Sequence, residues 1–456
     1  MKKIILCSIL FSLNVNADFD VAKNIQKFDW NGLEVTYIED NRFPVFDMGI
    51  YFSDGAISDV EGVGGETEAA FNMSMLGTTK YTRSELSEKL EFFGASSDVN
   101  VTHEYTTLSL SGLSKDIKEL TKLTCEVLRG ANYPLNEVKK VVNLQKNAMR
   151  SLENNHGALA SRIFREVSLS DTPFSYPTGG KLKDLDLLTG QNLRKKMDHF
   201  LNSVKKRIYI TGPKSVLEIR SIIENDCQFN GKEAQFVRTP TYNKKMQDGL
   251  QIVFAPVEKA NQVQVMVGTF LNHDELVDDE LAFLSSEFLG GGFTSRLMQE
   301  IRVKRGLTYS VGAVISSQKT YGRALISTFT KNETITELIK VIRNAIATSR
   351  GSNHQINEKQ FSLVKQGVIG SYPFKFEKTE QFLNELMITD HTEKKYEEIF
   401  QFQDKVKSYT KEDVAKKIEE VFNEKRMTIF VLGDKSLLSK LKKIGKVKVV
   451  NTKSFI

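Results

Sequence analysis

The architecture follows from an internal repeat: Thr189-Gly190-Gln191-Asn192-Leu193-Arg194-Lys195-Lys196-Met197 recurs without a gap as Thr410-Lys411-Glu412-Asp413-Val414-Ala415-Lys416-Lys417-Ile418. The two copies lie 221 positions apart, and each continues into a short apolar strand and a turn. Further upstream, Leu76-Gly77-Thr78 matches Leu289-Gly290-Gly291 at an offset of 213. Nearly constant offsets over such distances indicate two copies of one domain of roughly 210 residues.

Each copy mixes strands and helices. Hairpin-joined strands with helices grouped on one side predict an α+β fold of two homologous domains, each with a largely antiparallel sheet covered by helices. The sequence Thr82-Arg83-Ser84-Glu85 has the pattern of a capped helix start. Alternating β-branched and aromatic residues predict half-buried strands at 34–38, 45–52, 251–255 and 262–270. Further strands are expected at 97–101, 105–111, 207–211, 308–315, 324–329 and 427–432.

The first residues have the pattern of a targeting segment. Lys2 and Lys3 precede an apolar run over 4–13, and Val15-Asn16-Ala17 offers small residues for cleavage. We therefore expect a signal peptide at 1–17, cleaved near Ala17, and an exported mature chain. No later run reaches the roughly 18 apolar residues of a membrane span, so none is expected in the mature chain. The expected domains are 18–231 and 250–456, joined by a polar linker at 232–249.

Charge and cysteines limit the classes of partner. The net charge is +6, but the lysine cluster at 440–448 lacks interleaved aromatics and arginines, so a solvated face is expected and a nucleic-acid partner is not. Cys125 lies in a predicted amphipathic helix at 117–128, where a thiol is more often a small buried side chain. Since an exported protein enters an oxidising compartment, a bond between Cys125 and Cys227 stays open.

The most informative segment combines a glycine-rich loop with an arginine and a tyrosine: Gly290-Gly291-Gly292-Phe293-Thr294-Ser295-Arg296-Leu297-Met298-Gln299-Glu300-Ile301-Arg302, then Gly306-Leu307-Thr308-Tyr309-Ser310-Val311. The loop opens an amphipathic helix, Arg302 stands near its end, and Tyr309 opens the next predicted strand. The segment closely resembles the C-terminal domain signature of the pitrilysin/insulinase-type zinc peptidases, the family with an inverted His-x-x-Glu-His motif. The resemblance covers essentially the whole mature chain and implies that its two domains form a clam-like half.

The same resemblance assigns roles to individual residues. It implies that Arg302 and Tyr309 are catalytic, donating hydrogen bonds to the oxyanion or the carbonyl of a substrate, and that Gly290, Gly291 and Gly292 bind substrate. The residues alone also allow structural roles. Arg302 could cap the end of the helix, Tyr309 could pack on the strand, and the glycines could permit tight turns. For Arg296 we expect a structural role, as an ion pair or a helix-to-sheet contact.

The zinc motif itself is missing from this chain. Aligned on Leu76-Gly77-Thr78, the family's two histidines fall on Glu68 and Asn72, and its glutamate base falls on Phe71. A phenyl ring cannot accept a proton, and a neutral amide is a poor zinc ligand. We expect no metal in this chain and a salt bridge for Glu68. Of the six histidines (His103, His156, His199, His273, His354 and His391) no two lie within one helical turn, and His103 is expected to be structural.

These observations predict half of an active site. The expected function is the non-zinc-binding subunit of a heterodimeric periplasmic zinc metallopeptidase, inactive alone, whose partner is a homologous chain bearing His-x-x-Glu-His and whose substrate is a peptide. The alternative is a catalytically inactive peptide-binding or assembly protein of the same fold, a core or scaffold subunit.

Overall fold

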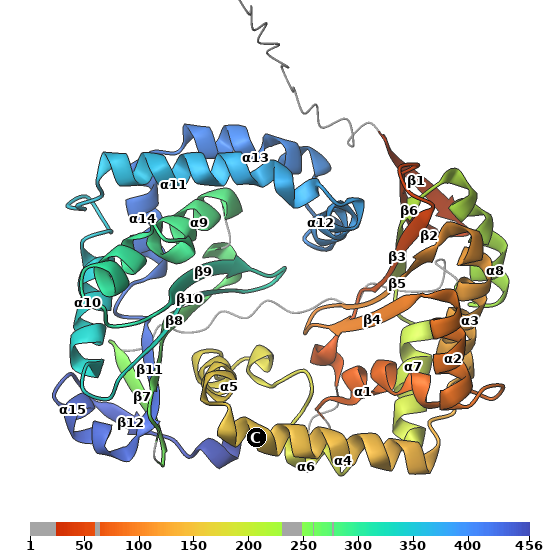
Figure 1. The fold of residues 1–456 in the computed structure, drawn as a ribbon, viewed down its shortest axis with the longest axis horizontal. Coiled ribbons are helices and arrows are strands. Elements are labelled where there is room, and N and C mark those ends of the chain that lie inside the picture. Colours follow the sequence, from red (N-terminus) through yellow and green to blue (C-terminus); the bar gives the residue numbers. More distant parts are fainter. Residues whose placement is uncertain (1–23, 60–63, 230–248, 259, 276–277) are drawn as a thin grey trace, which may run out of the picture.

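The structure is a computed structural model that describes residues 24–59, 64–229, 249–258, 260–275 and 278–456. The expected signal peptide and almost all of the expected linker lie outside these residues. The described chain forms two six-stranded sheets with helices around them, which confirms the α+β class (Figure 1). The first sheet contains β1 (Ile25–Trp30), β2 (Leu33–Glu39), β3 (Val45–Phe52), β4 (Ser96–Val101), β5 (Thr106–Leu113) and β6 (Lys206–Gly212). The second contains β7 (Gln251–Val257), β8 (Val263–Leu271), β9 (Val311–Ser317), β10 (Gly322–Thr330), β11 (Thr428–Asp434) and β12 (Val447–Val449).

The two sheets share one topology, as the repeat predicts. Their orders are β1-β2-β6-β3-β5-β4 and β12-β7-β11-β8-β10-β9, so β6 and β11 occupy equivalent central places. Both pair in parallel with the first strand of their copy, β2 or β7, whereas the hairpin strands are antiparallel. The edge strands β1 and β12 were not predicted. They break the symmetry between the two sheets. Strand β1 comes before β2 in the chain and pairs with it antiparallel, whereas β12 comes after β11 and pairs with β7 in parallel.

The helices begin at caps that the sequence encodes. Thr82 and Glu85 form the predicted capping box, in which the Glu85 carboxylate accepts the Thr82 amide at 2.7 Å. Thr189 and Thr410, the first residues of the repeat, cap α7 and α14 by accepting from the backbone amides of Asn192 and Asp413, and Thr410 completes a capping box with Asp413. The first half contains α1 (Glu66–Asn72), α2 (Arg83–Phe93), α3 (Ile117–Gly130), α4 (Leu135–Ser151), α5 (His156–Ser168), α6 (Leu182–Leu185), α7 (Gly190–Asn202) and α8 (Arg220–Asn225). The second contains α9 (Asp279–Ser286), α10 (Ile335–Ala347), α11 (Glu358–Ser371), α12 (Thr379–His391), α13 (Tyr396–Ser408), α14 (Lys411–Val421) and α15 (Leu438–Lys442).

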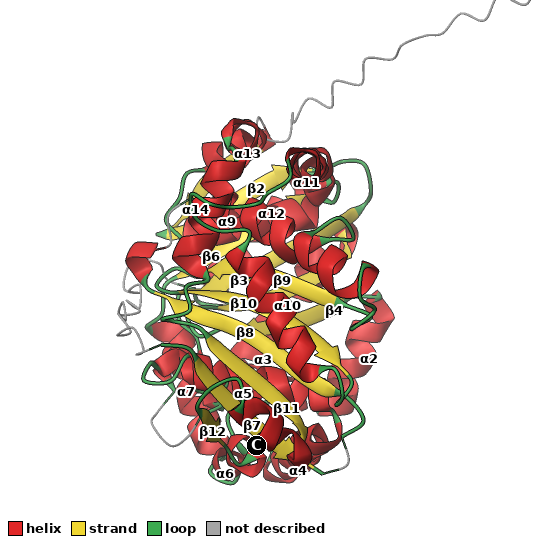
Figure 2. Ribbon diagram, turned by 90° about the vertical axis from the view of Figure 1, so that its left-hand side faces the viewer, coloured by secondary structure: helices red, strands yellow, loops and turns green. Residues whose placement is uncertain are grey.

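Each sheet is covered on one face by helices of its own half and on the other by a helix of the opposite half. Helices α1, α3, α7 and α8 pack on the first sheet, and α9, α10, α11 and α14 on the second (Figure 2). Helix α5 of the first half lies on β8 and β11 of the second sheet, and α12 of the second half lies on β6 and β3 of the first (Figure 1). None of the helices in the described residues is long and apolar enough to cross a membrane.

The sequence predicted half-buried strands, but the central strands are buried on both faces. The exchanged helices explain this difference, because each covers the second face of a sheet. Successive residues of β6 divide between two cores: Ile208 and Ile210 face the helices of their own half, whereas Tyr209 packs with α12. On β11, Phe430 and Leu432 pack with α5 in the same manner. Alternation of apolar and polar residues is absent because each strand has two apolar neighbours.

Phe382 of α12 tests the contribution of this exchange. Its side chain is fully buried between the halves, whereas Phe374, just before α12, is 70% exposed. Phe382→Ala is expected to lower the free energy of unfolding by about 3–5 kcal/mol, because truncating a buried phenylalanine leaves a cavity. Phe374→Ala is the matched control and is expected to stay within about 0.5 kcal/mol. Chemical denaturation of both variants measures the difference, and equal small effects would contradict the packing described.

A buried carboxylate, Glu104, joins the halves at the turn between β9 and β10. Although it lies in the first half, it accepts hydrogen bonds from the amides of Lys319 and Thr320, each at 3.0 Å, and from the Thr320 hydroxyl. His391 of α12 approaches it within 3.7 Å and is bonded through Nδ1 to the Tyr51 hydroxyl at 2.9 Å. Burial opposes ionisation, but these donors hold the pKa of Glu104 below its usual value.

His103 is the structural histidine that we expected. Its Nε2 lies 2.7 Å from the Tyr176 carbonyl and its Nδ1 lies 3.0 Å from a guanidinium nitrogen of Arg165. Since a guanidinium only donates, Nδ1 must accept and Nε2 must carry the proton, which fixes one neutral tautomer. Burial and the nearby Arg165 lower the pKa of His103 to about 4. The folded protein therefore opposes protonation of this ring.

The depressed pKa of His103 predicts how stability depends on pH. An unfolded histidine titrates near 6.5, so the unfolded chain binds the extra proton between pH 6.5 and about 4. This contribution is fully present above pH 6.5 and is lost as pH falls toward 4, by up to about 3 kcal/mol. Denaturation at pH 7 and pH 4.5 should show a smaller loss for His103→Gln, which stays neutral. Identical losses in both proteins would refute this source.

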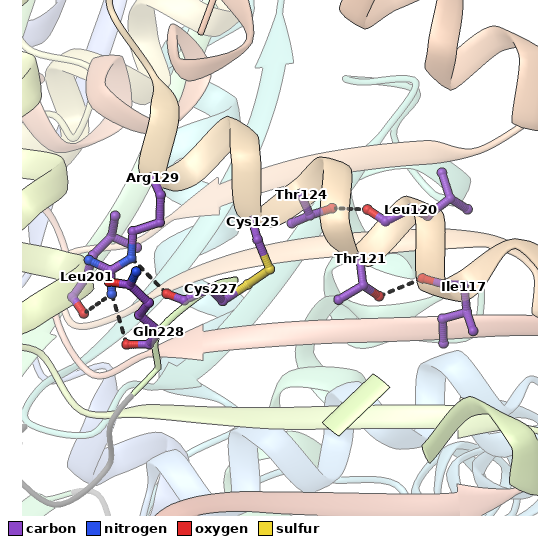
Figure 3. The surroundings of a disulfide bond; sticks show 9 residues. All are labelled: Ile117, Leu120, Thr121, Thr124, Cys125, Arg129, Leu201, Cys227 and Gln228. Carbon is purple, nitrogen blue, oxygen red and sulfur yellow. Dashed lines mark hydrogen bonds between the residues drawn. A yellow bond between two sulfur atoms is a disulfide. The ribbon is translucent and has the colours of Figure 1, made fainter. Parts of the chain in front are cut away.

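The described structure also contains a disulfide between Cys125 and Cys227 (Figure 3). The sequence favoured a free buried thiol at Cys125, and the structure corrects this. Both side chains are buried, and their Cα atoms lie 4.5 Å apart although 102 residues separate them. Arg129, one turn further along α3, donates to the carbonyls of Cys227 and Gln228 and so holds the same segment. Closing a loop of this length stabilises a fold by about 4–5 kcal/mol in the chain-entropy model.

Candidate functional site

The glycine-rich segment lies in the second half, where α9 passes into a π-helical stretch, Glu287–Gly291. A side chain at Gly290 would place Cβ 2.4 Å from the backbone nitrogen of Ala313 in β9, so only glycine permits this approach. At Gly291 a Cβ would meet the flexible end of Glu287, and at Gly292 it would meet nothing. Packing therefore explains Gly290, and a substrate-binding role for the three stays a prediction.

Arg302 and Tyr309 are brought together by a turn at Gly306. Arg302 lies near the end of a second π-helical stretch, Met298–Val303, and Gly306 has a φ of +63° that favours glycine. The Gly306 amide donates to the Arg302 carbonyl at 2.9 Å. We predicted that Tyr309 would open the strand. Strand β9 begins only at Val311, so Tyr309 precedes it. Hydroxyl groups replace the ladder here, since Thr328 and Thr308 both donate to the Ser310 carbonyl.

The guanidinium of Arg302 lies close to two aromatic rings. Its Cζ is 4.5 Å from the ring centroid of Tyr309 and 5.6 Å from that of Phe293. Both rings are largely exposed, Tyr309 by 73% and Phe293 by 61%. Among the described residues, no carboxylate or other acceptor is bonded to this guanidinium. Our sequence reasoning assigned no role to Phe293, although an aromatic residue directly after three glycines was a signal.

Glu300, two residues before Arg302 in the sequence, forms no ion pair with Arg302 and binds other cations. Glu300 binds Lys304 at 2.7 Å and Arg305 at 2.8 Å. Burial acts against it, but these two cations hold the pKa of Glu300 below its usual value. Arg296 donates to the Thr348 hydroxyl at the end of α10, rather than forming the expected ion pair or sheet contact. Arg302 is thus an uncompensated cation near the end of a helix, a place where positive charge is favourable.

The residues at the lost zinc motif do not converge on one site. Phe71 is buried in the first half, with ring centroids 5.2 Å from Phe52 and 5.0 Å from Phe200, whereas Asn72 is exposed. Glu68 accepts a hydrogen bond from Thr178 at 3.3 Å in place of the expected salt bridge, and burial raises its pKa. Within the described parts of the chain, no group of three or more histidine, cysteine, aspartate or glutamate side chains is arranged to hold a metal.

A family model connects this segment with known proteins. Residues 188–368 match the model described as the peptidase M16 inactive domain. This segment is therefore similar to a peptidase M16 inactive domain. The match runs from α7 through the glycine-rich segment to α11, so it includes Arg302 and Tyr309.

Relatives of this chain carry contrasting names, since one is called a zinc protease and another a non-peptidase homolog. It is similar to the uncharacterized zinc protease YmxG of Bacillus subtilis, with 20% identity over 368 residues, 79% of this chain and 88% of that protein. It is also similar to the non-peptidase homolog YmxG of Helicobacter pylori, with 23% identity over 317 residues, 68% and 70% of the two chains. Names therefore do not decide whether a relative of this chain catalyses hydrolysis.

Solved structures share the fold. A crystal structure of a peptidase M16 inactive domain from Pseudomonas fluorescens has a TM-score of 0.80 and 20% identity, covering 90% of this chain and 98% of that one. A protease from Helicobacter pylori gives a TM-score of 0.77 at 14% identity over 90% and 99% of the chains. The fold shared with these structures thus extends over both halves, beyond the segment matched by the family model.

Proposed function

We propose that this chain is the non-zinc-binding subunit of a heterodimeric periplasmic zinc metallopeptidase, in which a homologous partner supplies the metal site and this chain supplies Arg302 and Tyr309. The observation that carries the proposal is the contact between the Arg302 guanidinium and the Tyr309 ring, with no counter-ion bonded among the described residues. A phenol and a guanidinium side by side offer hydrogen bonds to the carbonyl oxygen of a peptide and to the oxyanion that forms from it.

Exposure of the pair argues for a second chain. Oxyanion donors contribute most where water is excluded, because a low dielectric strengthens each hydrogen bond. Tyr309 is 73% exposed, so this chain alone does not provide such surroundings. A partner that covers the pair would dry it and would bring its own metal site to the peptide. The disulfide between Cys125 and Cys227 supports the periplasmic placement, since such bonds persist in oxidising compartments.

Assembly without catalysis is the second candidate. Phe71 serves the core of the first half rather than any metal, and one relative is named a non-peptidase homolog. In this case the same exposed segment would grip a peptide or a partner, and no reaction would depend on the Tyr309 hydroxyl.

Metal analysis and peptide cleavage test the division of labour. The purified chain is expected to hold no stoichiometric zinc and to cleave no peptide, because Glu68, Phe71 and Asn72 occupy the motif positions. Activity should appear only when a homologous chain bearing His-x-x-Glu-His, co-purified from the native host, is added. One tightly bound zinc per chain, together with chelator-sensitive cleavage by the chain alone, would refute the proposal.

Tyr309→Phe separates the two candidates. In the assembled heterodimer it should lower kcat/KM by about 10²-fold, because it deletes one oxyanion donor and keeps the ring. Arg302→Lys should also be costly, since an ammonium group lacks the planar fork of donors. Tyr81→Phe in the first half is the control and should retain full activity. Size-exclusion chromatography verifies assembly, and unchanged turnover in an assembled Tyr309→Phe heterodimer would favour the assembly protein.

A further inference from the structure

Phe293 lies where no apolar core explains it. Its ring is 61% exposed, yet its backbone is held in place from two sides. The side-chain amide of Gln299 donates through Nε2 to the Phe293 carbonyl at 2.7 Å, and that of Gln360 in α11 donates through Nε2 to the neighbouring Thr294 carbonyl at 2.8 Å. The loop is therefore fixed by hydrogen bonds, and the exposed ring of Phe293 is free to contact other groups at the protein surface.

The contact that the ring makes is with Arg302. A guanidinium is attracted to the face of an aromatic ring, and it can stack there while its N–H donors remain directed outward in its own plane. Phe293 and Tyr309 both lie within the range of this interaction, at 5.6 and 4.5 Å from Cζ. With one ring alone, a flexible arginine side chain has many rotamers open to it. Contact with a second ring leaves the guanidinium fewer rotamers than contact with one ring would.

We propose that Phe293 is a positioning residue: together with Tyr309 it holds the Arg302 guanidinium so that its donors face a carbonyl oxygen of an extended peptide. The inference rests on the proposed function, which supplies the peptide. Phe293 touches no reacting atom and acts only through Arg302. The neighbouring cations Lys304 and Arg305 are bound to Glu300, so they do not compete for the same acceptor.

The first experiment examines the full-length chain alone. In protein labelled with ¹⁵N-arginine, ring currents should shift the Nε–Hε resonance of Arg302, which Arg302→Lys identifies by its disappearance. Phe293→Leu keeps an apolar side chain but removes the ring, so this resonance should move toward the position of an exposed arginine. Phe43→Leu is the matched control, since Phe43 is 66% exposed in the other half, and should leave the resonance unmoved. An Arg302 resonance that ignores Phe293→Leu would overturn the inference and leave the proposed function intact.

The second experiment uses the assembled heterodimer. Phe293→Leu is expected to lower kcat/KM about 10-fold, with the dissociation constant of the two subunits unchanged. In an Arg302→Met background the same substitution should have no further effect, because its influence passes through the guanidinium. Weaker subunit association with normal turnover at saturation would instead make Phe293 a partner anchor and overturn the positioning role. If the resonance shifts but neither Arg302→Lys nor Tyr309→Phe affects turnover, the proposed function fails, and this inference fails with it.

Discussion

Each half of the molecule places one helix on the sheet of the other, and the rest of the structure depends on this exchange. Helix α5 covers the second sheet and α12 covers the first, so neither sheet has a complete core without the opposite half. The apolar face that each sheet would otherwise expose is large, and burying it is the main favourable term in folding. The two halves are therefore one cooperative unit, although each repeats the same topology.

Polar contacts fix the geometry that apolar burial leaves undetermined. Hydrophobic contact is non-directional, whereas Glu104 accepts two backbone amides of the β9–β10 turn and so sets its position against the first half. An ionised carboxylate is tolerated there because two backbone amides and the Thr320 hydroxyl donate to it. This turn connects the edge strand β9 to the sheet, and β9 follows Tyr309 directly. The hydrogen bonds to Glu104 thus constrain β9, the strand next to the candidate site.

The sequence predicted what depends on local pattern and missed what depends on tertiary proximity. The repeat and the strand alternation predicted both sheets to within a few residues, because register and burial follow a fixed period. The two edge strands β1 and β12 were missed, since β12 has only three residues and few residues of β1 are buried. The bond from Cys125 to Cys227 was disfavoured because no local pattern reports that two segments 102 residues apart approach. At the site, the resemblance to the peptidase family singled out Arg302 and Tyr309, but the place of the Phe293 ring depends on how the loop folds.

The exposure of the candidate site has a physical consequence for where catalysis can reside. A guanidinium beside two largely exposed rings gains little from electrostatic interactions, because the solvent screens them and competes for each donor. The same group becomes a strong hydrogen-bond donor once a second surface removes that water. Tyr309, Phe293 and Arg302 belong to the residue types that dominate the energetics of protein interfaces. Under the proposed function, a partner that covers this surface would provide both binding energy and the dry surroundings that oxyanion stabilisation requires.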